Sequence, residues 1–377
     1  MKTAQQLAIR ANVRGVYDLQ AERIRMGQRI LAQFLAKLGL PPEPKSPPEN
    51  ETKEEREERL KRKAERDQLI SYFCEKLGIS QKEDDDKKKI TSFLDLVILD
   101  YKGIVDYVTS QNTTLRKAIP ASSMGIISDI SEIEILQAYF MLEEAEKKAI
   151  KVVQRSVEQH PLWTEFLKDV KGVGPMMAGV IIASFDIEIA RYVSSFWKIA
   201  GLDTVAVPIF DKDGEPVMVY DEATDSMVQA TKMEARSRKA SHLVEREYID
   251  KNGAIQTKKS ITYDPFLHTK LLGVLGSSFL KGRGHYSEVY HDYRNRIDNM
   301  PEHADKTPKH RHNMANRYAV KYFVQDLFLA WSMIVGKGFI KGPYHEEKLN
   351  MQPHSKQCPQ LIEVYKRYRP DLLPAGY

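Results

Sequence analysis

The most distinctive chemistry in this sequence lies in a short glycine-rich run near the middle of the chain, made of Lys171, Gly172, Val173, Gly174 and Pro175. Two glycines one residue apart allow the positive φ of a tight reversal, and Pro175 suits the first turn of a following helix. The amides of such a turn point outward at a helix N-terminus, where a phosphate binds readily, and Lys171 adds a positive charge. We expect a phosphate-binding turn here, although a plain turn between two core helices has the same pattern.

The residues on both sides of this run must supply the helices that position it. Phe166, Leu167 and Val170 have helical spacing before the run, and the apolar residues from Val180 to Ile182 follow it. The sequence therefore predicts a helix–hairpin–helix unit whose second helix is largely buried.

Three further groups of cations are candidates for contact with a nucleic-acid backbone. A basic segment runs from Thr231 to Ser260, a second group mixes cations with tyrosines between Lys281 and Arg296, and a third precedes a long helix expected from Met314 to Val335. Cations interleaved with tyrosines suit backbone contact and base stacking, and packing of these tyrosines in the core is an equal alternative. The candidates for DNA contact in the three groups are Lys258, Lys259, Lys281, Arg283, Lys306, Lys309 and Arg311.

We expect no metal site in this sequence. His303, His310 and His312 lie on an expected loop next to prolines, without a thiol or an acidic ligand at a recognised spacing. The consecutive carboxylates Asp84 to Asp86 have lysines beside them, which is typical of hydrated surface charge.

The composition indicates a globular chain without a membrane partner. The 377 residues are 42% hydrophobic and 29% charged, enough for two or three domains. We find no apolar run of ~18 residues and no signal peptide, so we expect a cytoplasmic location. Cys74 and Cys358 are far apart in sequence, which excludes a disulfide framework and a zinc ribbon, and we expect both to be inert. The net charge of +5 does not by itself demand nucleic acid.

Helical periodicity dominates the first part of the chain. Ala4 to Leu38 predicts a long amphipathic helix with a break near Gly15 or Gly27. The densely charged stretch from Glu49 to Asp67 predicts a solvated helix or arm, and a separate helix is expected from Leu69 to Leu77.

Further helices and one β-ribbon are expected downstream. Helices are predicted over Ile90 to Val108 and over Ser131 to Val157, the second with a capping box of Ser131 and Glu134. An alternating segment around the turn from Asp211 to Gly214 predicts a hairpin. The predicted fold class is mainly α, a helical bundle with coiled arms plus a helix-hairpin-helix domain with a small inserted β-ribbon. The expected domains are an N-terminal amphipathic helix (1–40), a charged linker or arm (41–89), a long helical hairpin region (90–160), the helix-hairpin-helix DNA-binding domain (161–337, with the ribbon at about 204–262) and a C-terminal tail (338–377).

Several motifs occur in an order that resembles a known family. After a long helix come His160-Pro-Leu-Trp-Thr-Glu-Phe-Leu, Val170-Lys-Gly-Val-Gly-Pro and Phe196-Trp-Lys-Ile-Ala-Gly-Leu, and then a basic segment. Lys270-Leu-Leu-Gly and Tyr286-Ser-Glu-Val-Tyr-His-Asp-Tyr-Arg follow ahead of a final helix. Over a little more than half the chain, this order resembles the C-terminal half of DEDD-type insertion-sequence transposases, which join a RuvC-like domain to a helix–hairpin–helix transposase domain. The resemblance implies DNA binding, recombination of an insertion element and, in studied members, guidance by a structured RNA.

The sequence departs from that family in two places. The family's acidic quartet begins on a strand near the N-terminus, whereas Met1 to Leu40 has helical periodicity and no aspartate before Asp18, so Mg²⁺ would act only if a partner supplies the nuclease site. The family's nucleophilic serine precedes a glycine, and Asn252 stands at that place. An amide cannot form the covalent phosphoester. The alternative nucleophiles are Ser260, Ser241 and Ser237.

We therefore expect a DNA-binding, transposase-related protein of a mobile element that acts in DNA transposition and recombination. The sequence leaves open whether the chain cuts DNA, and we favour a form that has lost strand cleavage. The alternative is a helical scaffold, or an RNA- or protein-assembly factor, without cleavage activity. The expected partners are DNA, structured RNA and a second copy of the chain through its coiled helices, and no cofactor is expected.

Overall fold

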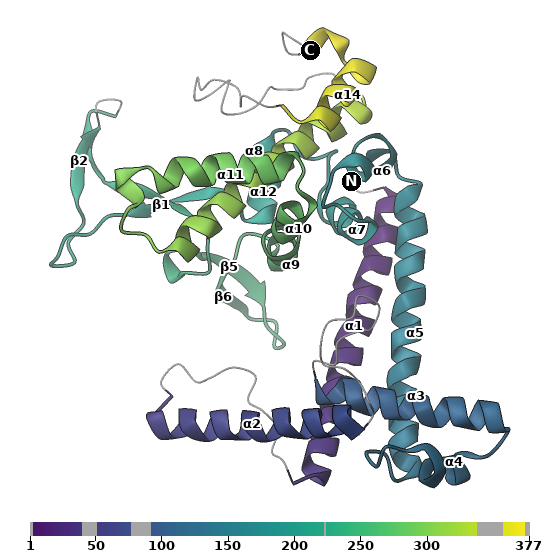
Figure 1. Ribbon diagram of the computed structural model, residues 1–377. Coiled ribbons are helices and arrows are strands. Elements are labelled where there is room, and N and C mark those ends of the chain that lie inside the picture. Colours follow the sequence, from purple (N-terminus) through teal and green to yellow (C-terminus); the bar gives the residue numbers. More distant parts are fainter. Residues whose placement is uncertain (1–2, 40–50, 77–91, 222–223, 338–356, 374–377) are drawn as a thin grey trace. The chain divides into compact units, whose positions relative to one another are not determined.

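A computed structural model of the chain describes residues 3–39, 51–76, 92–221, 224–337 and 357–373 (Figure 1). These residues are mainly helical, as the sequence predicts, and also form small antiparallel sheets. The chain forms two compact units: Arg14–Ile150, here the helical unit, and Met1–Val13 together with Lys151–Tyr377, here the mixed unit. The acidic run Asp84 to Asp86 lies outside the described residues.

The helical unit is built around one apolar core. Its helices are α1 (Ala4–Lys37), α2 (Lys53–Lys76), α3 (Phe93–Gln111), α4 (Leu115–Ser122) and α5 (Ile130–Glu158), of which α1 and α5 also have residues in the mixed unit. The side chains buried in this core include Ile30 and Phe34 of α1, Leu96 and Ile104 of α3, and Leu136 of α5. The apolar face predicted for the amphipathic helix α1 therefore packs against other helices of the same chain.

Two helices of this unit are longer than the sequence analysis expects. α1 continues through Gly15 and Gly27, so the predicted break is wrong. A Cβ at Gly27 would lie 3.3 Å from both Leu94 and Tyr139, which shows that this glycine serves close packing. α2 joins the charged stretch to the helix expected after it, because good helix formers continue across the junction.

The start of α5 differs from the predicted capping box. Ser131 lies inside the helix, where its amide donates to Asp129 Oδ1 at 2.8 Å. Glu132, and not Glu134, reaches back to the preceding loop and accepts from the amide of Ser128 at 2.8 Å. An N-cap at Ser131 would start the helix at Glu132, whereas α5 starts two residues earlier, at Ile130. The acid that reaches back is likewise two residues earlier in the chain than predicted.

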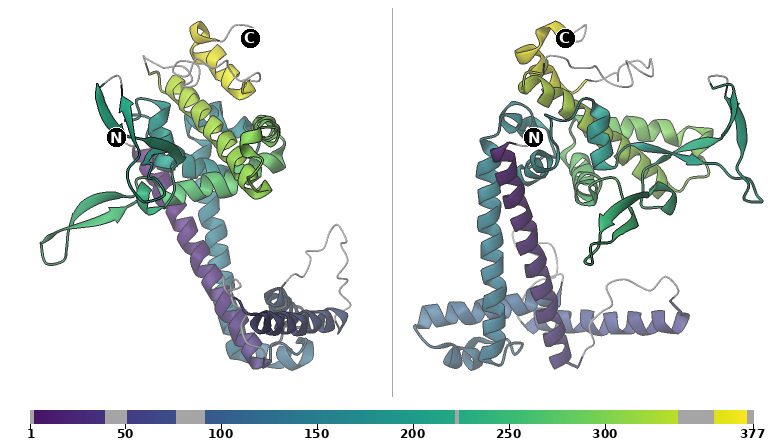
Figure 2. Two further views of the ribbon diagram at one scale, coloured as in Figure 1. Left: turned by 90° about the vertical axis from the view of Figure 1, so that its left-hand side faces the viewer. Right: turned by 180° about the vertical axis from the view of Figure 1, so that it is seen from behind.

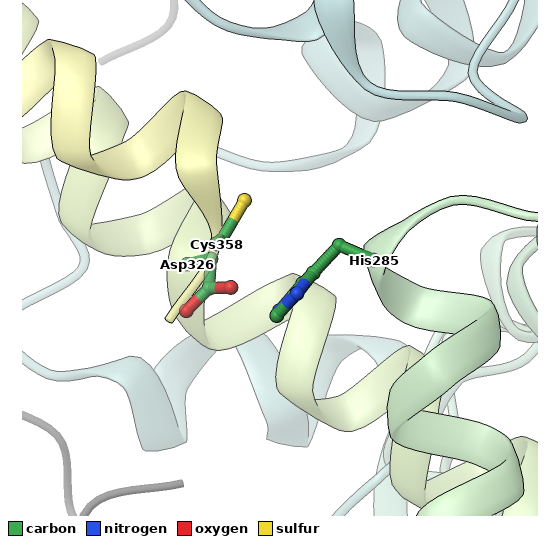
Figure 3. Close-up of side chains that lie close together, drawn as sticks. All are labelled: His285, Asp326 and Cys358. Carbon is green, nitrogen blue, oxygen red and sulfur yellow. The ribbon is translucent and has the colours of Figure 1, made fainter. Parts of the chain in front are cut away.

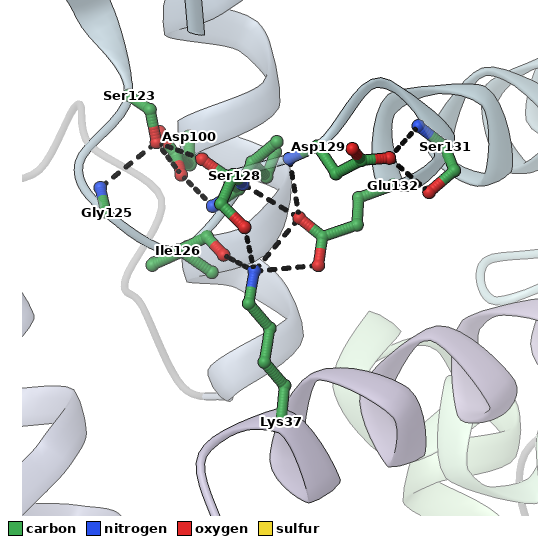
Figure 4. A network of polar contacts seen from close by, with 10 residues as sticks. Lys37, Asp100, Ser123, Gly125, Ile126, Ser128, Asp129, Ser131 and Glu132 are labelled. Carbon is green, nitrogen blue, oxygen red and sulfur yellow. Dashed lines mark hydrogen bonds and ion pairs between the residues drawn. The ribbon is translucent and has the colours of Figure 1, made fainter. Parts of the chain in front are cut away.

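A polar network fixes the loop between α4 and α5 (Figure 4). Lys37 Nζ, at the end of α1, donates to Glu132 Oε1 at 2.7 Å. The fully buried carboxylate of Asp100 accepts from the amides of Met124 and Ile127 at 2.7 and 2.8 Å. Because these buried acids are hydrogen-bonded to the backbone of the loop, the network has a structural role.

The mixed unit contains most of the remaining helices. They are α6 (Pro161–Glu165), α7 (Pro175–Ser184), α8 (Val193–Ala200), α9 (Pro265–Thr269), α10 (Gly276–Gly282), α11 (His285–Asp298), α12 (Pro308–Ile334) and α14 (Pro359–Tyr368). A π-helical turn over Lys270–Leu275 joins α9 to α10.

α12 runs through the core of the mixed unit. Trp331 meets Phe196 of α8 edge-on with ring centroids 6.1 Å apart. Earlier on the same helix, Phe323 meets Phe279 of α10 and Tyr286 of α11 edge-on, both at 5.3 Å. These aromatic contacts place α8, α10 and α11 around a single buried helix.

The N-terminus of α12 is a correction to the sequence analysis. The helix begins at Pro308, so Lys309 and Arg311 lie in its first turn and not on a loop. Thr307 is the N-cap, since its hydroxyl accepts from the amide of His310 at 3.2 Å, and Pro308 takes the first helical position. A threonine followed by a proline is a helix start signal, and it is present in the sequence at this point.

In the described part of the chain, the strands form three two-stranded antiparallel sheets where one ribbon was predicted (Figure 2). The pairs are β1 (Thr204–Pro208) with β4 (Thr231–Ala235), β2 (Met218–Asp221) with β3 (Ser226–Gln229), and β5 (Val244–Ile249) with β6 (Ile255–Ser260). The additional β5–β6 hairpin turns at Asp250, whose carboxylate accepts from the amides of Asn252 and Ala254. Gly253 there has a φ of +82°, as such a turn requires.

A pair of arginines ties the β1–β4 sheet to the helices. Arg236 donates to both carboxylate oxygens of Asp203, at 2.7 and 2.8 Å, and this hydrogen-bonded pairing raises the pKa of Arg236. Arg317 of α12 donates to the carbonyls of Gly201 and Asp203 at 2.8 and 3.0 Å. The base of the sheet is therefore held by bidentate contacts.

Within the described part of the chain, no helix is long and apolar enough to cross a membrane.

His160 gives the mixed unit a testable dependence on pH. Its Nδ1 accepts from the amide of Leu162 at 3.1 Å and so caps α6, while burial lowers the pKa of His160. Since the folded pKa lies below the unfolded value of about 6.5, stability is present above that pH and is lost as the pH falls below it. We expect urea midpoints of the wild type to fall between pH 7.5 and 5.5 more than those of His160→Asn, which keeps an acceptor without titrating. His160→Ala should lose about 1 kcal/mol at pH 7.5. Equal pH dependence in wild type and His160→Asn would contradict this assignment.

Candidate functional site

The glycine-rich run of the sequence forms a tight turn ahead of α7. Gly172 has a φ of +97°, and the buried Val173 closes the turn by donating from its amide to the carbonyl of Val170 at 3.0 Å. Gly174 is the N-cap of α7 and provides no side-chain hydrogen bond to the first turn. Lys171 and Gly174 are exposed. The N–H groups at the start of a helix are thus left to a ligand or to water.

A second glycine-rich turn, between α10 and α11, packs directly against the first. A Cβ on Gly172 would lie 2.9 Å from the ring of Phe279, and one on Gly282 would lie 3.3 Å from the amide nitrogen of Gly172. A Cβ on Gly284 would lie 2.8 Å from the Cβ of Lys171. The two backbones can approach this closely only because these positions are glycine. The role of Gly282 and Gly284 was not predicted from the sequence, although their spacing repeats that of Gly172 and Gly174.

We call these two turns, residues 171–175 and 281–284, the double-turn surface. It carries the N-caps of both α7 and α11, and Gly284, like Gly174, makes no side-chain capping hydrogen bond. The cations Lys171, Lys281 and Arg283 are exposed on it. The acidic residues nearest to it in sequence are Asp169, which precedes Val170 and Lys171, and Glu288, in the first turn of α11. Most of the residues predicted to bind DNA therefore come together with two helix N-termini.

The other predicted DNA contacts lie on different elements. Lys258 and Lys259 are exposed on β6, and Lys258 Nζ lies 4.8 Å from the ring centroid of Tyr248. Lys309 is exposed in the first turn of α12. Arg311 forms an ion pair with Asp298 at 2.7 Å, so its charge is partly engaged within the protein.

The tyrosines between Lys281 and Arg296 serve mainly in packing. Tyr286 and Tyr290 are buried. Tyr293 stacks on Tyr318 of α12 with ring centroids 4.0 Å apart. Of the two roles left open by the sequence, the structure therefore supports packing for this group.

Ser237 has a histidine beside it. Its Oγ lies 3.0 Å from Nδ1 of His242, whose side chain is completely buried. The amide of Ser237 also donates to that nitrogen at 3.0 Å, so Nδ1 is the acceptor and Nε2 carries the proton. Nε2 lies 3.5 Å from Glu234 Oε2 and, in the described structure, forms no hydrogen bond. A hydroxyl, an imidazole acceptor and a carboxylate in this order are the parts of an activated serine nucleophile.

The carboxylate in this group is held as an anion. Lys239 and Lys232 pair with Glu234 at 2.9 and 3.1 Å, and these hydrogen bonds lower the pKa of Glu234 to about 2. Ser241, by contrast, is exposed on the same short loop, and Ser260 Oγ is buried without a hydrogen bond in the described structure. Of the three candidate serines, Ser237 has the adjacent base.

A buried polar cluster joins α11, α12 and the start of α14 (Figure 3). His285, Asp326 and Cys358 each offer one metal-ligating atom, and the three atoms lie within 4.8 Å of one another. The hydroxyl of Tyr286 donates to Asp326 Oδ2 at 2.9 Å and lies 3.4 Å from Cys358 Sγ. Burial raises the pKa of Asp326 to about 7 and that of Cys358 to about 12. This cluster was not predicted from the sequence, because its members are far apart in the chain and do not show the spacing of a known metal-ligand motif.

No protein-family model, curated protein or solved structure matches this chain. The proposals for its function therefore rest on the residues and their geometry, and on the motif order.

The contact between the two turns predicts a large difference between neighbouring glycines. Gly172→Ala should lower the free energy of unfolding by about 1–3 kcal/mol, because its positive φ is strained for alanine and the new Cβ meets Phe279. Gly174→Ala is the matched control, since nothing lies within 4 Å of its Cβ position and its φ is −93°. We expect it to cost about 0.5 kcal/mol. Urea unfolding of both variants tests this, and equal losses would refute the close approach.

Proposed function

We propose that this chain is a DNA-binding, transposase-related protein of a mobile element, acting in DNA transposition or recombination. The double-turn surface is the observation that carries the proposal. It combines two adjacent, glycine-capped helix N-termini with the exposed cations Lys171, Lys281 and Arg283. The order of motifs that resembles the transposase family, in which this turn lies, supports the same function.

The chemistry of this surface suits the phosphate backbone. A helix N-terminus presents N–H donors and a partial positive charge, and glycine lets a phosphate approach the backbone. Such contacts position a protein on DNA without reading sequence. Lys258, Lys259 and Lys309 are exposed and would extend the contact beyond the double-turn surface. Because the net charge is only +5, local clustering of cations must supply the electrostatic attraction.

DNA binding should depend on the double-turn surface and on salt. The variant Lys171→Gln, Lys281→Gln, Arg283→Gln keeps each Cβ and removes three charges. We expect it to bind branched or duplex DNA more weakly and to lower the slope of log affinity against log salt by up to about 2.7, which is about 0.9 for each phosphate that is no longer neutralised. Fluorescence anisotropy at several salt concentrations measures both quantities.

The matched control for this experiment removes three charges from an exposed helix face. Lys147, Lys148 and Lys151 of α5 are exposed, and their change to glutamine should leave the slope nearly unchanged. Equal weakening in both triple variants would show a general charge effect and would count against the double-turn surface. Salt-dependent binding of structured RNA without DNA binding would favour the assembly-factor alternative.

A second candidate function is strand cleavage by Ser237, and the group of Ser237, His242 and Glu234 favours it. His242 Nδ1 would take the hydroxyl proton while Ser237 Oγ attacks a backbone phosphorus. The new O–P bond replaces the bond from that phosphorus to one nucleotide oxygen, and this oxygen leaves with the proton that His242 returns. Because the nucleophile in this step is Ser237, the asparagine at position 252 does not by itself exclude cleavage.

A covalent protein–DNA adduct would report this chemistry. We expect a denaturation-resistant adduct with wild type, loss of it in Ser237→Ala and at least about a 100-fold slower formation in His242→Gln, because a general base contributes about 10²–10⁴ in rate. Ser241→Ala, on the same loop, should retain the adduct. An adduct that persists in Ser237→Ala would overturn the assignment, and absence of any adduct from the wild type would favour a protein that binds without cutting.

A further inference from the structure

Three side chains with metal-ligating atoms meet inside the mixed unit. His285 is the first residue of α11, Asp326 lies within α12, and Cys358 is the N-cap of α14. Figure 3 shows the imidazole directed from α11 toward the carboxylate on α12, with the thiol beside them. One nitrogen, one oxygen and one sulfur atom thus lie within 4.8 Å of one another.

This cluster lies in the core of the mixed unit, where ionisable side chains such as these are unusual. Asp326 and Cys358 are 4% and 2% exposed, and the adjacent Tyr286 is 2% exposed. In the described structure, Asp326 has no ion pair with lysine or arginine, and its one hydrogen bond comes from the Tyr286 hydroxyl. A buried carboxylate is normally paired with a cation or coordinates a metal. The missing positive charge is the feature that a bound cation would supply.

We propose that His285, Asp326 and Cys358 form a Zn²⁺ site that fastens α14 to α11 and α12. Thiolate, imidazole and carboxylate together are the donors that zinc accepts, whereas Mg²⁺ and Ca²⁺ prefer oxygen alone. The site goes beyond the proposed DNA-binding function and does not depend on it.

The geometry allows this coordination after a small adjustment. Tetrahedral zinc with bonds of about 2.0–2.3 Å places its ligand atoms about 3.3–3.8 Å apart, so the three side chains must close by about 1 Å. Three protein ligands leave a fourth position for water. The Tyr286 hydroxyl, 2.9 Å from Asp326 Oδ2, lies where it can orient the carboxylate from outside the coordination sphere.

Binding exchanges protons for the metal. The S–H bond of Cys358 breaks, a bond between sulfur and Zn²⁺ forms, and the thiol proton passes to solvent. The charge of the cation is then balanced by the thiolate and by the carboxylate of Asp326, so burial no longer leaves an uncompensated anion.

Cobalt substitution tests the site in the full-length chain, purified with a chelator and without a histidine tag. We expect one Co²⁺ per chain, the visible bands of tetrahedral cobalt, a near-ultraviolet thiolate-to-cobalt charge-transfer band, and displacement by Zn²⁺. Zn²⁺ should also raise the melting temperature, since it binds the folded form. Cys358→Ser should abolish the charge-transfer band. Asp326→Asn, which keeps the volume and a neutral side chain, should lower the affinity at least about 100-fold, and Tyr286→Phe about 10- to 100-fold.

Matched controls separate this site from weak surface binding. Cys74→Ser removes the buried cysteine of the helical unit, and His291→Gln removes an exposed histidine of α11, and both should bind Co²⁺ like the wild type. The wild type alone can overturn the proposal, because absence of stoichiometric Co²⁺ with thiolate charge transfer excludes Cys358 as a ligand. A folded Cys358→Ser or Asp326→Asn variant that binds with unchanged affinity would overturn it as well.

Discussion

The contact between two glycine-rich turns is the constraint on which the candidate interface depends. Gly172 adopts a φ of +97° and lies so close to the turn at Gly282 that a side chain on either residue would meet backbone or a buried ring. This contact fixes the start of α7 against the start of α11, and it directs Lys171 and Arg283 to the same surface. A phosphate site made of backbone amides is positioned only as precisely as the turns that carry those amides. The close packing of these glycines would therefore also position the amides for the proposed function.

α12 is the element that holds the remaining parts of the mixed unit in place. Its aromatic side chains contact α8, α10 and α11, and Arg317 binds the backbone at the base of the β1–β4 sheet. The sheet that carries the Ser237 loop is therefore positioned from the same helix that carries Asp326. The bidentate pair of Arg236 and Asp203 completes this support close to Ser237 in sequence. Rigid packing of this kind is what precise placement of functional groups requires.

Local signals explain what could be predicted from the sequence. The long helix of α1 and the turn at Gly172 follow from periodicity and from glycine and proline chemistry, which act over a few residues. Contacts between distant segments could not be predicted in this way. Gly282 has a clear role only once the turn it touches is known, and Asp326 meets Cys358 because α14 packs on α12. His242 lies between these cases. It is close to Ser237 in sequence, but it faces the serine because it ends the short 3₁₀ turn Ala240–His242.

The two proposed sites meet at the start of α11, and this has a thermodynamic consequence. Gly284, whose backbone contacts Lys171, directly precedes His285, the first metal-ligating residue, and Arg283 precedes both. A cation bound by His285 would hold the first turn of α11, and hence the amides and the arginine of the proposed phosphate contact. Any such effect must be reciprocal, because a metal that favours the DNA-binding arrangement is itself bound more tightly when DNA is present. The coupling free energy can be no larger than the difference in metal-binding free energy between the arrangements of that turn with and without DNA. A rigid double-turn surface would therefore show little coupling, and one that rearranges on binding DNA would show more.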